Sequence, residues 1–142
     1  MDQNEALLQA VVRGTEMGKN TLRQLLPMTG EPALRAELLR QQREYRRLNQ
    51  KAHTALAALG TQADGLGVRA RTVTRMGVAA RARRDPSPEH LARMVVEGSA
   101  MGLSDCLGAR NDCPCASRGA KKLADRLCQL EREGARNLRT FL

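Results

Sequence analysis

Apolar residues recur at alternating spacings of three and four in four stretches of the chain, which is the pattern of one helix face in a bundle. In residues 3–26 this face carries Leu8, Val11, Thr15, Gly18, Leu22 and Leu25. In residues 31–59 it carries Leu34, Leu38, Gln41, Tyr45, Leu48, Ala52, Ala55 and Leu59. Only Pro27-Met28-Thr29-Gly30 lies between the two stretches, and so short a link predicts an antiparallel helical hairpin.

A second hairpin is predicted over residues 87–141. Ser87 is a good N-cap and Pro88 suits the first helical position, so the third helix should begin here and run to about Ala109. Its inward positions are Ala92, Val95, Ser99, Gly102 and Cys106. After a polar loop at 110–116, the fourth helix should fill 117–141, with an inward face of Leu123, Leu127, Leu130, Gly134, Leu138 and Phe141.

The first and third helices share a repeated pattern, Gly-x-x-Met-Gly, which is preceded in both by two valines. Its copies are Gly14 to Gly18 and Gly98 to Gly102. A mid-helix glycine costs about 1 kcal/mol relative to alanine, so two of them on one face, twice, indicate a packing role. We expect the two helices to touch where these glycines permit a close approach.

Residues 61–86 form the connection between the hairpins. Gly60 predicts the end of the second helix, and a short basic helix is expected within residues 68–84. The sequence thus predicts one all-α domain over 1–142: a four-helix bundle made of hairpin 3–59, basic crossover 61–86 and hairpin 87–141.

The glycine-containing helices, the basic crossover and the segment from Leu39 to Tyr45 resemble a ferritin-like four-helix-bundle family of bacterial domains of unknown function. That resemblance raises the question of a di-iron site, which needs two Glu-x-x-His motifs besides two further glutamates. His53 and His90 are preceded three residues earlier by Gln50 and Ser87, so this ligand set is missing and no cofactor is expected. We interpret one glutamate per helix as a solvated or interface-edge carboxylate: Glu16, Glu44, Glu97 and Glu131.

The chain is basic, with 24 Lys and Arg against 15 Asp and Glu and a net charge of +9. The excess is densest in the crossover, where the candidate anion-binding residues are Arg69, Arg71, Arg75, Arg81, Arg83 and Arg84. They would contact the phosphates of nucleic acid or anionic lipid, or form a solvated face. Tyr45 and Phe141 are the only aromatic residues, too few to stack the bases of single-stranded RNA.

Four cysteines lie in the second hairpin: Cys106, Cys113, Cys115 and Cys128. With a helical turn centred near Cys113, we expect Cys106 to face residue 120 and Cys128 to lie ~12 Å further along. Weak metal-site candidates are therefore Cys106, Cys113 and Cys115, and the alternative, which we favour, is free thiols. Cys113 and Cys115 should be accessible in their loop.

No phosphate-binding glycine loop, nucleophile elbow or catalytic dyad is present in the sequence. No apolar run approaches 18 residues, so no transmembrane segment is expected, and the acidic, polar start does not resemble a signal peptide. We therefore expect a cytoplasmic, non-enzymatic helical bundle that binds a protein partner or forms a homo-oligomer. The alternatives are a nucleic-acid-associated protein and a thiol or metal-binding protein that uses the Cys113/Cys115 loop.

Overall fold

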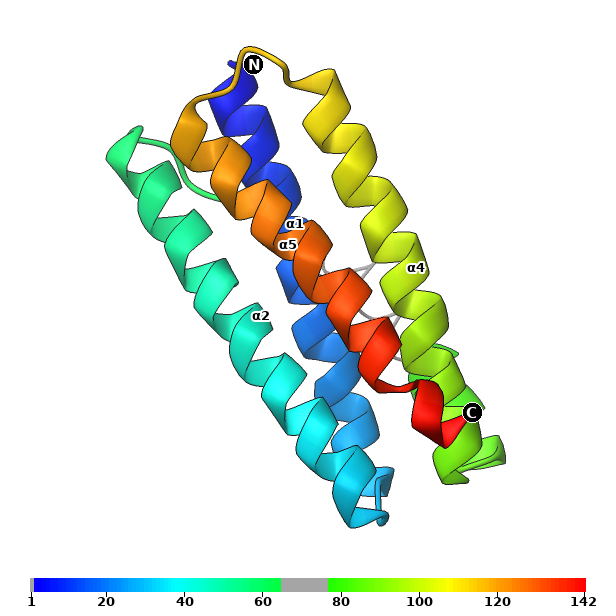
Figure 1. Cartoon of the computed structure of the whole chain (residues 1–142). Coiled ribbons are helices and arrows are strands. Elements are labelled where there is room, and N and C mark those ends of the chain that lie inside the picture. Colours follow the sequence, from blue (N-terminus) through cyan, green and yellow to red (C-terminus); the bar gives the residue numbers. More distant parts are fainter. Residues whose placement is uncertain (1, 65–76) are drawn as a thin grey trace.

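The computed structural model describes residues 2–64 and 77–142, in which all regular secondary structure is helical (Figure 1). The long helices of this part are α1 (Gln3–Leu25), α2 (Pro32–Ala58), α4 (Pro88–Asp112) and α5 (Arg118–Asn137). Single 3-10 turns, Leu26–Met28 and Arg139–Phe141, follow α1 and α5. Residues 77–84 are also helical, within the stretch where a short crossover helix was expected. The prediction of an all-α protein is confirmed.

The long helices lie side by side, and two of them contact all of the others. α1 packs against α2, α4 and α5, and α5 packs against α4, α1 and α2 (Figure 1). The side chain of Gln9 near the start of α1 bonds to the backbone of Gln62 and Asp64, just after α2. The α4–α5 loop reaches the same end, because the Cys115 N–H donates to Gln3 at 2.6 Å. α1 and α5 therefore run in one direction, and α2 and α4 in the other.

Side chains next to the helix starts satisfy the first backbone N–H groups. Ser87 accepts from His90 N–H at 3.2 Å, as the sequence predicts, and Ser117 accepts from Ala120 N–H at 3.1 Å. Gly60, with φ +74°, follows the end of α2 in the left-handed conformation that suits glycine.

The core is built mainly of Leu, Val and Ala, and most of the predicted inward positions are buried. In α2 the predicted face holds as far as Ala52, beyond which Leu56 is fully buried and Leu59 is 46% exposed. The prediction of Leu59 as inward is therefore wrong. An α-helix has 3.6 residues per turn. Inward positions chosen at a mean spacing of 3.5 residues therefore drift off the buried face over several turns.

The buried stripe of α5 is wider than predicted. It includes adjacent residues in two successive turns, Leu127 with Cys128 and Leu130 with Glu131. The reason is the position of α5, which packs against α1, α2 and α4 at once and so has little of this surface left for water. This extra width brings Glu131 into the interior.

None of the helices in residues 2–64 and 77–142 combines the length and the apolar character needed to cross a membrane.

Candidate functional site

A groove of about 520 Å³ opens between α1 and α4. Both copies of the repeated glycine pattern form its walls, Gly14 and Gly18 on α1 and Gly98 and Gly102 on α4. Side chains from α2 and α5 also line it: Gln41, Tyr45, Leu127 and Glu131. Its volume lies within the range of about 300–1,000 Å³ that is typical of small-molecule pockets.

The glycines do not pack against one another, which corrects the sequence-based expectation. A Cβ atom on Gly18 would lie 2.6 Å from the ring of Tyr45, and one on Gly102 would lie 2.8 Å from a carboxylate oxygen of Glu131. A Cβ on Gly14 would lie 2.9 Å from Leu127, whereas one on Gly98 would meet no atom of residues 2–64 and 77–142 within 4 Å. Three glycines therefore make room for side chains from α2 and α5, and Gly98 leaves the groove open.

Tyr45 and Glu131 form a buried hydrogen-bonded pair beneath the groove. The Tyr45 hydroxyl donates to Glu131 Oε1 at 2.5 Å, and the two residues are 4% and 5% exposed. The Ser99 hydroxyl of α4 also hydrogen-bonds to this pair. The sequence predicted that Tyr45 and Ser99 lie inside the bundle, and the structure confirms it.

Burial controls the ionisation of the pair. Desolvation raises the pKa of Glu131 to about 7, although its hydrogen bonds with Tyr45 and Ser99 favour the ionised form. Desolvation, followed by the nearby negative charge of Glu131, raises the pKa of Tyr45 well above its ordinary value. Glu131 thus changes charge near neutral pH, while Tyr45 stays protonated and able to donate.

No lysine, arginine or histidine among residues 2–64 and 77–142 forms an ion pair with Glu131. The groove's other charged lining residues in this part of the chain are Arg13, Arg81, Glu97 and Asp105. Arg81 is already paired with Glu97 at 3.1 Å. With Glu131 ionised, the described lining therefore holds more negative than positive charge, in a chain whose net charge is +9.

Gln41 adds a second buried polar group. Its Nε2 donates to the carbonyl of Gly134 at 3.3 Å. Its Oε1 is buried and has no hydrogen-bond partner in the described structure, although the residue is only 1% exposed. An unpaired buried acceptor is costly unless something donates to it, so Gln41 is a candidate ligand contact.

Two of the four cysteines meet next to the groove, and they are not the predicted set. Cys106 borders the groove, and its Sγ lies 2.7 Å from Cys128 Sγ on α5. The Cys106 thiol also donates to the carbonyl of Ala124 at 3.1 Å. Burial raises the pKa of the Cys106 thiol well above its ordinary value.

The proposed grouping of Cys106, Cys113 and Cys115 was wrong because the turn was centred too early. α4 continues to Asp112 and α5 begins at Arg118, so Cys106 lies opposite Ala124 rather than residue 120. Cys113 is buried, contrary to expectation, while Cys115 is exposed as expected. Within residues 2–64 and 77–142, no group of three or more His, Cys, Asp and Glu side chains is arranged to hold a metal ion.

The four glutamates considered in the sequence do not converge. Glu44 pairs with Arg47 and Arg126, and Glu97 pairs with Arg81. Glu16 lies 3.7 Å from His53.

The interpretation of Glu131 as a solvated or edge carboxylate is wrong. The sequence did carry a signal for its burial, because Leu127-Cys128 one turn earlier already offers apolar residues at two adjacent positions. Such a pair is typical of a helix with a broad buried stripe.

The structure describes half of the candidate anion-binding residues. Arg69, Arg71 and Arg75 lie outside the described residues. Arg83 and Arg84 are exposed on the helix at 77–84, and Arg81 is the groove residue that pairs with Glu97.

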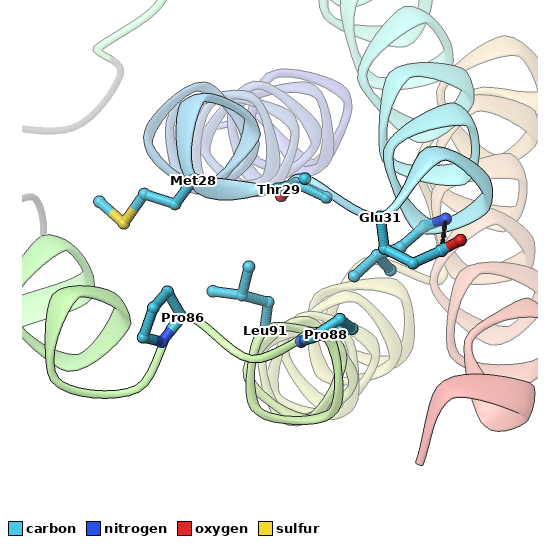
Figure 2. Close-up of a pocket in the computed structure, with 8 residues that line it drawn as sticks. Met28, Thr29, Glu31, Pro86, Pro88 and Leu91 are labelled. Atoms are coloured by element: carbon cyan, nitrogen blue, oxygen red, sulfur yellow. Dashed lines mark hydrogen bonds between the residues drawn. The ribbon is translucent and has the colours of Figure 1, made fainter.

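A second, smaller hollow of about 280 Å³ lies where the start of α4 meets the α1–α2 link (Figure 2). Met28, Pro86, Pro88 and Leu91 surround it. Its polar side chains are engaged, because Glu31 caps α2 through Leu34 N–H at 2.7 Å and the Thr29 hydroxyl donates to the Leu25 carbonyl. The α1–α4 groove is therefore the better candidate site.

Comparison of the chain with protein-family models, curated proteins and solved structures gives no match. The resemblance to a ferritin-like family accordingly stays a prediction.

Proposed function

We propose that this protein is a non-enzymatic binding protein that holds a small, mostly apolar ligand in the groove between α1 and α4. One observation carries the proposal: a groove of about 520 Å³ lies over a buried polar group, the Tyr45–Glu131 pair. Ligand sites in proteins combine an apolar lining with a few placed polar groups. Apolar side chains lining this groove include Met17, Met94, Val95, Met101 and Leu127.

The open glycine supports the same proposal. Gly98 lies within α4, where it costs about 1 kcal/mol relative to alanine, and no side chain from another helix in the described part of the chain lies within 4 Å of its Cβ position. Two methionines that line the groove, Met17 on α1 and Met101 on α4, are partly or largely exposed. Methionine adapts its shape to a bound molecule, so this wall of the groove suits an apolar ligand.

The proposal includes a ferritin-like arrangement of the helices. Its support is the pair of antiparallel hairpins, α1–α2 and α4–α5, with α4 starting at the bundle end opposite to the one where α2 finishes. That order is the one expected of two hairpins joined by a long crossover. A cytoplasmic location is part of the proposal too, and is supported by four free cysteines, which a reducing compartment favours.

The sequence-based prediction of a protein partner or self-association stays a prediction, as does binding to nucleic acid. A helix with its side chains is about 10–12 Å across, which is too wide for a groove of about 520 Å³ to enclose. The groove therefore favours a small molecule over an amphipathic helix.

Fluorescence of N-phenyl-1-naphthylamine, an uncharged apolar dye that brightens in apolar surroundings, tests the proposal. Gly98→Leu should fill the groove without touching the core. Gly108→Leu is a matched control, since Gly108 is an exposed glycine of the same helix that is not among the groove's described lining residues. A Cβ on Gly108 would also meet no described atom within 4 Å.

We expect saturable dye binding by the wild type and by Gly108→Leu, and at least about a tenfold loss of affinity in Gly98→Leu, because a filled pocket cannot bury the ligand. Equal dye binding by Gly98→Leu and the wild type, or no binding by either, would overturn the proposal.

A further inference from the structure

The Glu131 carboxylate is the most unusual group in the groove. It is almost fully buried, and no cation in residues 2–64 and 77–142 pairs with it. Burial of an ionised carboxylate is costly unless it is both hydrogen-bonded and paired with a positive charge. Tyr45 and Ser99 supply hydrogen bonds, but they supply no charge. A ligand with a positive group would supply it.

The carboxylate is also within reach of the groove wall. The nearest atom to a Cβ on Gly102 would be Glu131 Oε2, at 2.8 Å. Gly102 and Glu131 both line the groove. A glycine at this position therefore leaves room for the carboxylate to lie against α4, at the wall of the groove.

A second acceptor lies one helical turn away from Glu131. Gln41 precedes Tyr45 by one turn on α2 and packs on Gly134, which follows Glu131 by about one turn on α5. Its Oε1 has no hydrogen-bond partner among residues 2–64 and 77–142. An ammonium group carries three donors and no acceptor, so it could bond to the carboxylate and to this amide oxygen together.

The charge of the surrounding groove favours the same class of ligand. Among its described lining residues, three carboxylates stand against two arginines, and Arg81 is already paired with Glu97. The rest of the chain is strongly basic. The excess of carboxylates in the described lining therefore favours a cation in this groove, although the protein as a whole is basic.

We propose that the ligand is an amphipathic primary amine, whose ammonium group binds Glu131 and Gln41 and whose apolar body lies along the methionine-lined wall of the groove. This inference rests on the proposed ligand-binding function. Tyr45 and Ser99 act as positioning residues, because they hold the carboxylate in place beneath the groove.

The ionisation of Glu131 makes amine binding detectable as a release of protons. Glu131, with its pKa raised to about 7, is partly protonated at neutral pH, so an ammonium ion that binds it displaces a proton. Tyr45 on α2 and Cys106 on α4 keep their protons there, since burial raises the pKa of both. Among the described residues, the groove's other charged groups are Arg13 on α1, Arg81 in 77–84, and Glu97 and Asp105 on α4. Cys128 of α5 adjoins Cys106.

The test uses three probes with one apolar body: hexylamine, hexan-1-ol and hexanoate, each displacing N-phenyl-1-naphthylamine at pH 8. We expect the amine to bind about tenfold or more tightly than the alcohol, because a hydrogen bond to a charged group is stronger than a neutral one, and the acid to bind weakest. Glu131→Gln should remove the preference for the amine and leave the alcohol nearly unchanged. Glu133→Gln, the same change on α5 outside the groove lining, is the control and should keep the preference.

A measurement on the wild type does not depend on how well the Glu131 variant folds. Hexyltrimethylammonium carries a fixed charge, so its affinity should rise as Glu131 ionises between pH 6 and pH 8, and the heat of hexylamine binding at pH 7 should vary with the ionisation enthalpy of the buffer. If the dye binds and Gly98→Leu blocks it, but amine and alcohol compete equally and no proton is released, the amine inference is wrong and the binding function stands. If the dye never binds, the function itself fails.

Discussion

The glycine pairs of α1 and α4 have the same sequence pattern but different surroundings. On α1, Gly14 is covered by Leu127 and Gly18 by the ring of Tyr45. On α4, Gly102 is covered by the carboxylate of Glu131, and no residue in the described ranges covers Gly98. The repeated pattern therefore creates space on both helices, and the difference in what fills that space turns three positions into packing and the fourth into a groove.

The residues that cover Gly18 and Gly102 also meet each other. Tyr45 comes from α2 and Glu131 from α5, the second helix of each hairpin, and they are joined by a hydrogen bond of 2.5 Å. One half of the molecule thus contributes a neutral aromatic residue and the other half an acid. In a strictly repeated structure the second helices of the two hairpins would contribute equivalent side chains here. Because they differ, Glu131 provides a titratable group at this position.

The largest effect should come from filling a covered glycine. Gly18→Leu places a side chain where the Tyr45 ring already lies 2.6 Å from the Cβ position, and overpacking of this kind costs about 3 kcal/mol at the upper end of its usual range. Urea unfolding should show the loss. An unchanged midpoint would mean that Tyr45 does not occupy this space.

The next effect concerns pH. The pKa of Glu131 rises from 4.5 to about 7 on folding, so the folded state holds the proton more tightly. This stabilising effect of the raised pKa is complete below pH 4.5 and is lost as the pH rises from there through 7, a decrease of about 3 kcal/mol in the free energy of unfolding. Unfolding of the wild type and Glu131→Gln at several pH values isolates this contribution, because the variant lacks it. Parallel pH curves for the two proteins would contradict the burial of Glu131.

Filling the open glycine should have a smaller effect of opposite sign. A Cβ on Gly98 would meet no atom of residues 2–64 and 77–142 within 4 Å, so the free energy of unfolding of Gly98→Leu should stay level or increase by up to about 1 kcal/mol through higher helix propensity. Gly108→Leu should behave alike. A Gly98→Leu variant as unstable as Gly18→Leu would show that the two glycine pairs are equally covered and that no groove exists.

The smallest perturbation is alkylation of the cysteines. Cys115 is exposed while Cys106, Cys113 and Cys128 are buried, so Cys115 should react first with iodoacetamide, and its labelling should leave the melting temperature nearly unchanged. Mass spectrometry of partly labelled protein gives the order. Early labelling of Cys106 would place it outside the α4–α5 contact.

The helices themselves could be predicted from sequence because their signals are local. Ser87-Pro88 marks the start of α4, and the alternating spacings mark most of the buried face of each helix. The repeated glycine pattern is visible in the sequence, but its role is not, because what covers a glycine depends on side chains from other helices. Tyr45 and Glu131 come from α2 and α5, and no spacing in the sequence relates them.

The predicted grouping of the cysteines and the predicted exposure of Glu131 are wrong for related physical reasons. The position of Cys128 opposite α4 and the burial of Glu131 both depend on where the α4–α5 turn is centred and on how many helices surround α5. A shift of two residues in a turn displaces the facing residues on the two helices by several positions. Which cysteines meet therefore depends on the exact ends of the α4–α5 loop, and the ends of helices are the features that a sequence predicts least accurately.

The central claim is that the groove beside Gly98 binds a ligand above Glu131, and titration of ¹⁵N-labelled protein with hexylamine, followed by amide NMR shifts, tests it most directly. The account predicts saturable shifts for the backbone amides of Gly98 and Gly102 and for the side-chain amide of Gln41, with Gly108 and Gly119 unchanged. Shifts that avoid the groove, or that never saturate, would contradict it.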